Sequence, residues 1–409
     1  MLDLLDLCLF KQEVYLKSER LILILLATVN FTNILDFMVM MPLGPQLKRV
    51  FDLSPSEWSL IVSCYTFAAF VSGIGSIFII DRFDRKKILL LVYSGFLIGT
   101  FLCGIAQSYW FLLIARTVAG VFGGIIGAVV LSIVGDLIPL ERRGKAMGIV
   151  LTGFSAAAAL GVPLGLLFGT LYSWHIPFLS IVGMGLIILV LLIKIIPSAK
   201  PQWVDGKRKK NKETLHLIFS DLNKLKGFSL MGLVIFGQFL VVPFLSPYMV
   251  SNVGFSEMEL TYIYFFGGIV TIFTSPWVGK LADRYGRARV FSFFVIGSCL
   301  PILAITHLGQ TPVYYVIIIT TLFFITVSGR FIPAIAIVLS TAEPEIRGRF
   351  MSVRSAIQQL IAGVASFISG LIMVELPNGS YSNYHFIGYI STIACLLTLL
   401  LVKRIREKY

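Results

Sequence analysis

Charged residues are scarce in this chain of 409 residues: they make up 13% of it, whereas hydrophobic residues make up 57%. The mean hydropathy is +0.90. About a quarter of the residues in a soluble globular protein are charged, because water must solvate its surface. The composition therefore excludes a soluble protein and indicates one whose outer surface is covered by lipid.

Cysteine is also sparse, and its five copies stand singly, without the paired spacing of metal sites and redox motifs. We expect free thiols and no metal. The sequence contains no glycine-rich phosphate-binding loop, and no nucleophile–base constellation stands out. These absences point away from an enzyme and from an ATP-driven pump, and we expect no cofactor.

Acidic residues are fewer than basic ones, 21 against 34, so the formal net charge is +13. Nucleic-acid binding would require the basic residues to form one patch. They lie instead in short clusters between apolar runs, which is the pattern that orients membrane proteins. We expect the lipid bilayer as the surroundings and no nucleic acid as a partner.

Long apolar runs fill the rest of the sequence. A helix that spans a bilayer needs about 20 mostly apolar residues. Twelve such runs occur, at approximately residues 20–43, 58–80, 88–106, 109–135, 146–169, 176–196, 228–250, 260–280, 290–308, 312–339, 351–373 and 385–402. Because lipid offers the backbone no hydrogen bonds, and the short alternating segments of a barrel are lacking, we predict an all-α polytopic membrane protein.

The basic residues also predict the orientation. If both termini are cytoplasmic, all but four of the 34 Lys and Arg residues lie in cytoplasmic segments. Lys48 and Arg49 lie in an outer loop, and Arg116 and Arg330 lie inside apolar runs. Since Lys and Arg gather on the cytoplasmic side, we expect a multi-pass protein of the bacterial inner membrane with both termini inside.

The two halves of the chain repeat each other. Four landmarks recur after 201 to 204 residues: Pro42 and Pro243, Ser54 and Ser256, Asp81 and Asp283, and Arg143 and Arg347. Parallel repeats of six helices are typical of transporters that bind substrate between the repeats. We expect a cytoplasmic tail (1–19), an N-terminal six-helix bundle (20–196), a cytoplasmic linker (197–227), a C-terminal six-helix bundle (228–402) and a second tail (403–409).

The loop from Gly279 to Arg287 reads Gly-Lys-Leu-Ala-Asp-Arg-Tyr-Gly-Arg, and its counterpart in the first half keeps the acid and the arginines but has Ile77 and Asp84 for the glycines. A loop that is merely positive would not need the acid in both halves. The loops resemble the G-x-L-x-D-R-x-G-R signature of the major facilitator superfamily. This resemblance covers the whole chain and implies two pseudo-symmetric bundles and a cytoplasmic gate made by Asp81, Arg82, Arg85, Asp283, Arg284, Gly286 and Arg287.

Carboxylates are favoured at helix N-termini, where the backbone amides carry partial positive charge. By the symmetry of the repeat, we expect Asp81 to face the start of the eleventh spanning helix and Asp283 to face the start of the fifth. Such contacts would hold the cytoplasmic side closed and break when it opens.

The fifth run contains Gly161-Val-Pro163-Leu-Gly165, which is similar to arabinose-efflux-type members of the twelve-helix drug–proton antiporter family, although the G-P-x-x-G-G form is absent. An ordinary proline kink is the other interpretation. The resemblance implies a hinge at these three residues and export rather than import.

The first run places Asn30, Asn33, Asp36 and Met40 on one broad helix face. Its Leu-Asp…Pro pattern resembles the first-helix motif of the same exporters, and the Arg116…Gly120 pair in the fourth run resembles a second superfamily motif. A buried structural carboxylate is the alternative interpretation of Asp36. The resemblance implies proton coupling by Asp36 and Arg116 and a substrate cavity that includes Asn30, Asn33, Phe37, Met40 and Gln238.

The depths of the two charges can be compared. At 1.5 Å per residue, Asp36 lies about 24 Å from the cytoplasmic start of its helix, and Arg116 lies about 10 Å below the outer face. In a core about 30 Å thick they lie at similar depth, so we predict that their side chains approach each other. Arg330 allows two interpretations, snorkelling to the interface or a functional charge.

We therefore predict a monomeric, proton-coupled secondary transporter that exports small, mostly lipophilic compounds by alternating access, with the proton gradient as its energy source. One alternative is a sugar or metabolite exporter, which would need more Asn, Gln and Trp in the spanning helices. Another is a non-transporting receptor or scaffold on the same fold. The intact second loop and the buried Asp36 argue against that alternative.

Overall fold

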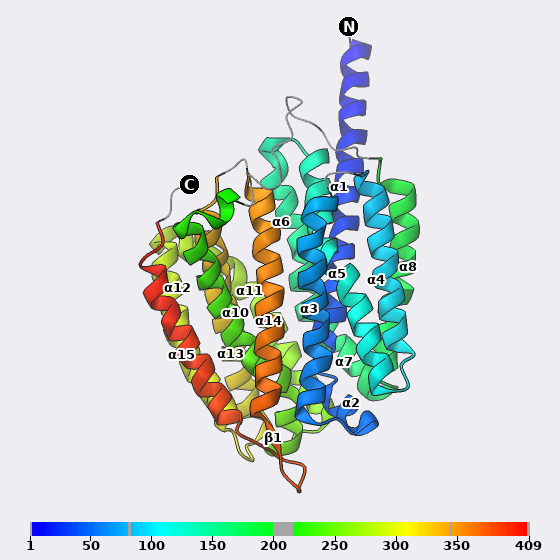
Figure 1. Ribbon diagram of the computed structural model, residues 1–409. Helices are drawn as coiled ribbons and strands as arrows, with labels where there is room; N and C mark the ends of the chain where they lie inside the picture. The colour runs from blue at the N-terminus through cyan, green and yellow to red at the C-terminus, as the bar shows by residue number, and fades with distance from the viewer. Residues whose placement is uncertain (1, 81–82, 199–215, 344–345, 407–409) are drawn as a thin grey trace.

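The computed structural model describes residues 2–80, 83–198, 216–343 and 346–406, and for residues 2–18, 78, 79, 140 and 141 it describes the backbone only. In the described part of the chain, twelve helices are long and apolar enough to cross a membrane, as predicted. They form two bundles of six spans each (Figure 1). The all-α fold follows from the length and hydrophobicity of these segments, because a helix bonds its own backbone within the bilayer.

The spans of the first bundle are α1 (Leu2–Val39), α3 (Pro55–Ile79), α4 (Arg85–Gly104), α5 (Tyr109–Leu137), the composite helix α6 (Leu140–Ala156), η1 (Ala157–Gly161) and α7 (Val162–Leu171), and α8 (His175–Ile195). Those of the second bundle are α10 (Leu222–Tyr248) continued by η3 (Met249–Val253), α11 (Glu257–Tyr285), α12 (Arg287–His307), α13 (Val313–Leu339), α14 (Arg347–Ile372) and α15 (Tyr384–Val402). The short elements are α2 (Gly44–Phe51) and the antiparallel strands β1 (Val374–Glu375) and β2 (Tyr381–Ser382).

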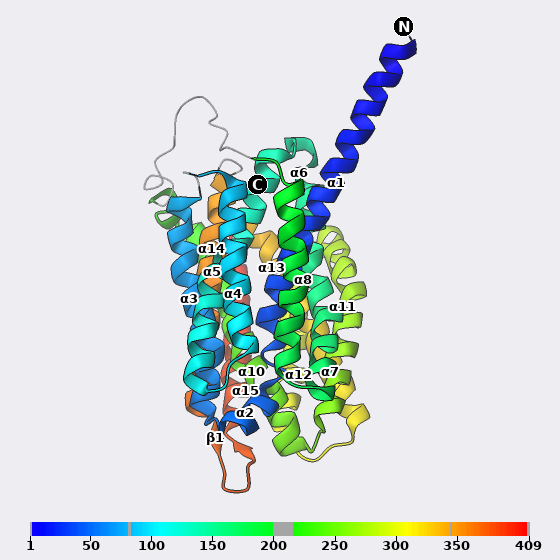
Figure 2. The ribbon, with the colours of Figure 1, turned by 90° about the vertical axis from the view of Figure 1, so that its right-hand side faces the viewer.

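The two ends of the molecule differ. The start of α1 and the end of α15 lie at one end, named here the terminal end, and α1 extends beyond the bundles there (Figures 1 and 2). The residues expected as an N-terminal tail are thus helical from Leu2 and continuous with the first span. Helix α2 and the β1–β2 hairpin lie at the opposite end, named here the hairpin end (Figure 2).

The repeat is visible at the starts of α3 and α11. Ser54 caps α3 through its hydroxyl, which accepts from the Glu57 amide, while the Glu57 carboxylate accepts from the Ser54 amide at 2.9 Å. Ser256 and Glu259 form the same reciprocal pair at α11, with the return bond at 2.8 Å. Each of these reciprocal pairs is a capping box, which bonds backbone amides that have no partner at the start of a helix. The pseudo-symmetry therefore extends from sequence landmarks to matching local hydrogen bonds.

The bundles meet along two pairs of helices. Helix α3 packs against α14, where a Cβ added at Gly363 would lie 2.6 Å from Thr66 Oγ1. Helix α11 packs against η1, where a Cβ at Gly268 would lie 2.5 Å from Ala159 Cα. Small residues allow helices in a membrane to approach this closely. Small residues thus allow α14 and α11 to approach the first bundle closely at these two places.

Three polar contacts join the bundles at the hairpin end. Trp58 Nε1 on α3 donates to the carbonyl oxygen of Pro243 on α10 at 2.9 Å. Lys48 on α2 lies 2.7 Å from a carboxylate oxygen of Glu375 on β1, and Arg49 pairs with Glu257 on α11. The two basic residues that the sequence places outside therefore each contact an acid of the other bundle. We name these three contacts the latch.

Candidate functional site

A buried ion pair lies in the middle of the first bundle. Arg116 on α5 donates through Nη1 to Asp36 Oδ2 on α1 at 2.9 Å, and Thr100 on α4 donates to Asp36 Oδ1 at 3.0 Å. Both charged side chains are 0% exposed. The approach that the sequence predicts from equal depth is therefore present, and Thr100 completes a three-helix cluster.

The electrostatics of this pair make it sensitive to protonation. A charge inside a bilayer is costly, and a partner of opposite charge offsets much of that cost. Arg116 Nε and Nη2 are buried without a hydrogen-bond partner, so Asp36 supplies most of the compensation that Arg116 receives. Neutralising Asp36 would leave an uncompensated guanidinium, and the surrounding helices would have to move or admit water or another anion.

Tyr65 on α3 links the ion pair to the boundary between the bundles. Its ring lies 4.4 Å from the Arg116 guanidinium carbon, which is a cation–π contact. Its hydroxyl donates to Asn33 Oδ1 at 3.1 Å. Its ring centroid is 5.2 Å from that of Phe37, which in turn lies 5.9 Å from Phe239 on α10. A continuous set of contacts thus runs from the charged pair to the second bundle.

The remaining predicted cavity residues have different surroundings. Asn30 is buried and directs its amide toward the carbonyl oxygen of Val150 on α6 at 3.4 Å, away from the ion pair. Met40 is 1% exposed within the core shared by both bundles. Gln238 is half-buried, and its side chain makes no hydrogen bond within the described residues. Of the five, Asn33 and Phe37 are therefore the ones that contact the Tyr65 side chain.

A π-helical turn ends at Gly161, the first residue of the predicted hinge in the fifth span. Residues Ala157–Gly161 form η1, and Pro163 follows in the first turn of α7. A π-turn inserts an extra residue into the helical ladder, and such turns occur often at functional sites. A Cβ at Gly165 would lie 2.7 Å from Val39 Cγ2, so this segment packs tightly against α1. The π-turn thus lies where α1 and α11 both contact the fifth span.

The two signature loops place corresponding residues in different surroundings. Gly286 has φ of 92°, a conformation that glycine adopts without strain, and it ends α11. In the first half Asp84 replaces this glycine and instead caps α4 by accepting from the Lys86 amide at 2.8 Å. Arg85 is buried and donates to Asp136 at 2.9 Å on α5. The two loops are therefore built differently despite the shared motif.

The predicted inter-bundle contact of Asp283 is not present in this conformation. The side chain is exposed, and in the part of the chain that the structure describes it makes no ion pair or hydrogen bond. Arg284 stacks on neighbouring Tyr285, at 5.3 Å from the ring centroid, and Arg287 is half-buried. An exposed carboxylate is already solvated by water and gains little from the helix start it was expected to face. Asp81 and Arg82 lie outside the described residues.

Arg330 on α13 does not snorkel. Its side chain is 0% exposed, and Nη1 contacts Ser298 Oγ at 3.2 Å and Cys395 Sγ at 2.6 Å. A Cβ at Gly237, the position that pairs with Asp36 in the repeat, would lie 3.0 Å from the same sulfur. The second bundle therefore also buries an arginine beside this position, but with a thiol and a hydroxyl in place of the carboxylate.

Sequence reasoning missed Tyr65, Thr100 and Asp136. Thr100 and Tyr65 lie within apolar runs, where a single polar residue carries no spacing signal. The polar stretch Ser63-Cys-Tyr-Thr66 inside the second span was the one available hint. In the residues that the structure describes, no three His, Cys, Asp or Glu side chains gather as a metal site would require.

Two six-helix bundles, a repeated capping pattern and an ion pair buried among the spanning helices are typical of a polytopic transport protein built from parallel repeats. The sequence profile described as the Major Facilitator Superfamily matches residues 26–236 and 227–408. These ranges cover most of the chain, which therefore belongs to the Major Facilitator Superfamily.

Curated relatives and solved structures agree with this assignment. The chain is 22% identical over 365 residues to a probable sugar efflux transporter of Pasteurella multocida, covering 89% of this chain and 86% of that protein. It is 21% identical over 257 residues to a probable sugar efflux transporter of Helicobacter acinonychis, covering 63% of this chain and 64% of that protein. The crystal structure of a D-xylose–proton symporter has a TM-score of 0.76 at 19% identity, covering 96% and 98% of the two chains.

Proposed function

We propose that this transporter exports small molecules in exchange for protons, by alternating access of a site between the two bundles. The observation that carries the proposal is the fully buried Asp36–Arg116 pair with its Thr100 hydrogen bond. An intramembrane acid that faces a cation is a natural place to bind and release a proton. The terminal end is cytoplasmic in this proposal, since the basic loops gather there.

The cycle begins with Asp36 ionised and paired with Arg116. A proton from the outside binds the Asp36 carboxylate and weakens its attraction to the guanidinium. Arg116 then shifts, and Tyr65, which stacks on it and bonds Asn33, carries the change toward Phe37 and the second bundle. When the site faces the cytoplasm the proton leaves and substrate enters. Each proton that moves inward supplies about 2.3 kcal/mol per 100 mV of membrane potential.

Small, mostly lipophilic compounds are the first candidate substrates. Phe37 and Phe239 approach each other from the two bundles, and aromatic rings offer an apolar surface that accepts varied shapes. Sugars are the second candidate. The similarity to probable sugar efflux transporters supports them, as does the half-buried amide of Gln238, which has hydrogen-bonding capacity left for a hydroxyl.

The proposal is tested by substrate-dependent proton flux in proteoliposomes. A panel would contain a lipophilic dye, arabinose and a disaccharide, each presented on the side of the terminal end. Native protein should couple proton movement to at least one compound. Asp36→Asn should lose proton-driven transport by at least a hundredfold, because a carboxamide does not gain or lose a proton in the physiological pH range and so cannot serve as the proton carrier.

Asp52→Asn is the matched control. It makes the same chemical change at an exposed carboxylate whose left-handed conformation asparagine tolerates. It should transport as native protein does. Full proton-driven transport by a folded Asp36→Asn variant would overturn the role of Asp36. Binding of panel compounds without any transport would favour the receptor or scaffold interpretation.

A further inference from the structure

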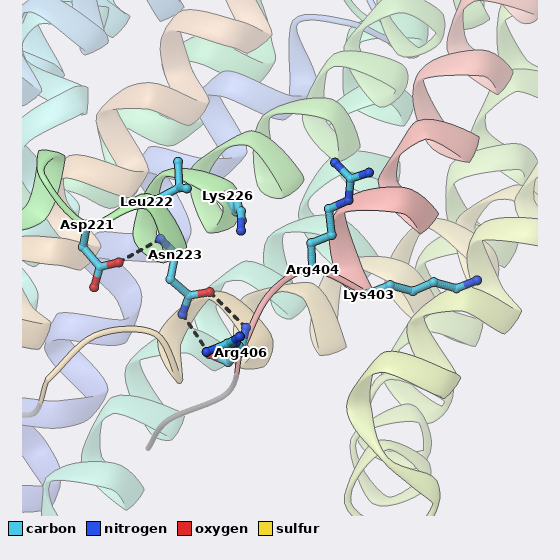
Figure 3. Close-up of a pocket in the computed structure, with 7 residues that line it drawn as sticks. All are labelled: Asp221, Leu222, Asn223, Lys226, Lys403, Arg404 and Arg406. Atoms are coloured by element: carbon cyan, nitrogen blue, oxygen red, sulfur yellow. Dashed lines mark hydrogen bonds between the residues drawn. The ribbon is translucent and has the colours of Figure 1, made fainter.

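A basic cavity lies at the terminal end, where α10 begins and α15 ends. It has a volume of about 500 Å³ and is lined by Asp221, Leu222, Asn223, Lys226, Lys403, Arg404 and Arg406. Figure 3 shows Lys226 of α10 and Arg404 beyond α15 on either side of the same space. Four cations and one carboxylate thus surround a cavity that the transport cycle described above does not use.

The cations of this cavity have no acidic partner among the residues that the structure describes. Within the described residues, none of Lys226, Lys403, Arg404 and Arg406 forms an ion pair. The one carboxylate present, that of Asp221, is already engaged, since it caps α10 by accepting from the Asn223 amide at 2.8 Å. Like charges held together repel one another, so an anion that entered the cavity would be bound favourably.

The cavity is held in shape by the backbone of the C-terminal segment. Asn223 donates through Nδ2 to the Arg406 carbonyl oxygen at 2.8 Å and accepts from the Arg406 amide at 2.9 Å. These reciprocal bonds fix the chain beyond α15 against the first turn of α10. The N-terminus of α10, which carries partial positive charge, adds to the field at the same place.

The position of the cavity indicates which anions can reach it. The spans that flank it begin at Leu222 and end at Val402, so it lies at the boundary between hydrocarbon and headgroups. Basic pockets beside spanning helices on the cytoplasmic side bind the phosphates of anionic lipids. We infer that this cavity is a binding site for a phosphate group, supplied by an anionic phospholipid of the inner leaflet or by soluble phosphate. The inference uses the orientation proposed above but not the proton-coupled export.

Lipid binding can be measured directly by native mass spectrometry of delipidated protein in detergent. The probes are phosphatidylglycerol, phosphatidylcholine as the zwitterionic lipid, and inorganic phosphate as competitor. Native protein should bind phosphatidylglycerol in preference to phosphatidylcholine. The triple variant Lys226→Gln, Arg404→Gln, Arg406→Gln should bind phosphatidylglycerol more weakly, on the order of a hundredfold. The single variant Arg404→Gln should weaken phosphatidylglycerol binding about fivefold. It tests the inference even if the triple variant does not fold.

The matched control removes three exposed cations from elsewhere on the terminal end: Lys145→Gln, Lys280→Gln and Arg289→Gln. It changes the net charge equally and should retain the binding. Displacement of the lipid by millimolar inorganic phosphate, with phosphate bound in its place, would identify soluble phosphate as the source. Equal binding by native protein, Arg404→Gln and the triple variant, or no preference for phosphatidylglycerol, would overturn the inference. Because binding is read without transport, either proposal can fail while the other stands.

Discussion

At the scale of single residues, the buried Arg116 guanidinium determines what its neighbours must provide. The guanidinium forms an ion pair with Asp36, and the Tyr65 ring covers one face of its plane. Two of its nitrogens stay without hydrogen bonds. The proposed cycle requires Arg116 to change partners, and partial satisfaction favours this, because a fully bonded guanidinium would be held in one arrangement.

The positioning role proposed for Tyr65 gives the first prediction at this scale. Tyr65→Phe keeps the ring over Arg116 but removes the hydroxyl that bonds Asn33, a loss worth about 1 kcal/mol. We expect the KM for substrate to rise about fivefold, with an unchanged pH profile of transport. Tyr65→Leu also removes the cation–π contact, worth about 2 kcal/mol when desolvated, and should shift the pH profile.

The pair of variants separates positioning from packing. Transport would be measured across a pH series in proteoliposomes, with folding checked by size-exclusion chromatography. If Tyr65→Phe displaced the pH profile as much as Tyr65→Leu, the hydroxyl rather than the ring would be the coupling element. If both variants behaved as native protein, Tyr65 would have no positioning role.

At the scale of elements, close packing of α3 against α5 places Tyr65 on Arg116. A Cβ at Gly124 would lie 2.5 Å from Ala69 Cα, and one at Gly120 would overlap the Tyr65 carbonyl oxygen. Gly120, which the sequence pairs with Arg116, and Gly124 therefore act through packing. Tyr65 reaches Arg116 because α5 has glycines where α3 crosses it, so the two helices can approach closely.

Substituting a glycine of α5 by alanine should destabilise the protein more, the closer the added methyl group lies to a neighbouring helix. Gly124→Ala forces a methyl group into the α3 backbone and should lower the free energy of unfolding by about 1–3 kcal/mol. Gly135→Ala on the same helix meets no atom within 4 Å and should leave stability unchanged or raise it, since alanine is the better helix former. Thermal unfolding in detergent checks both. A Gly124→Ala variant as stable as Gly135→Ala would contradict the packing account.

At the scale of the whole molecule, the latch joins the bundles at the hairpin end. Lys48 also lies 4.4 Å from the Tyr381 ring centroid, so the loop between α14 and α15 contacts α2 in two ways. Opening the hairpin end requires these contacts to break together with the Trp58 hydrogen bond. Ion pairs that water still reaches contribute about 1 kcal/mol each, so the latch biases the equilibrium without locking it.

Loosening the latch should favour the state that is open at the hairpin end. Spin labels at Val50 and Leu376, both exposed, would report the distance between the bundles in a background without native cysteines. The double variant Lys48→Gln, Arg49→Gln should raise the population of longer distances about fivefold. Trp58→Phe, which keeps an aromatic ring but removes the N–H donor to Pro243, should act in the same direction.

Lys280→Gln, at the terminal end, is the control and should leave the distances unchanged. Unchanged distances in both latch variants would show that the latch does not control opening.

The sequence alone determined the class of fold and the approach of Asp36 to Arg116. Apolar runs of spanning length permit one kind of backbone bonding in lipid, so the spanning helices could be counted from the hydrophobic pattern. The approach of Asp36 and Arg116 could be predicted because a helix has a constant rise, which converts residue number into depth. The repeat could be recognised because Ser54 and Ser256 hold the same local capping role in each half.

Only the tertiary structure decided which side chains face one another around a helix. The depth of a residue does not specify the direction in which its side chain leaves the helix axis. The rotation of each helix about its own axis brings Thr100 and Tyr65 to the ion pair and turns Asn30 toward α6. It also buried Arg330 beside Cys395 and left Asp283 exposed. These outcomes depend on close contacts between helices distant in sequence, such as α3 on α5 at Gly124, and no periodicity within one helix encodes the rotation of its neighbours.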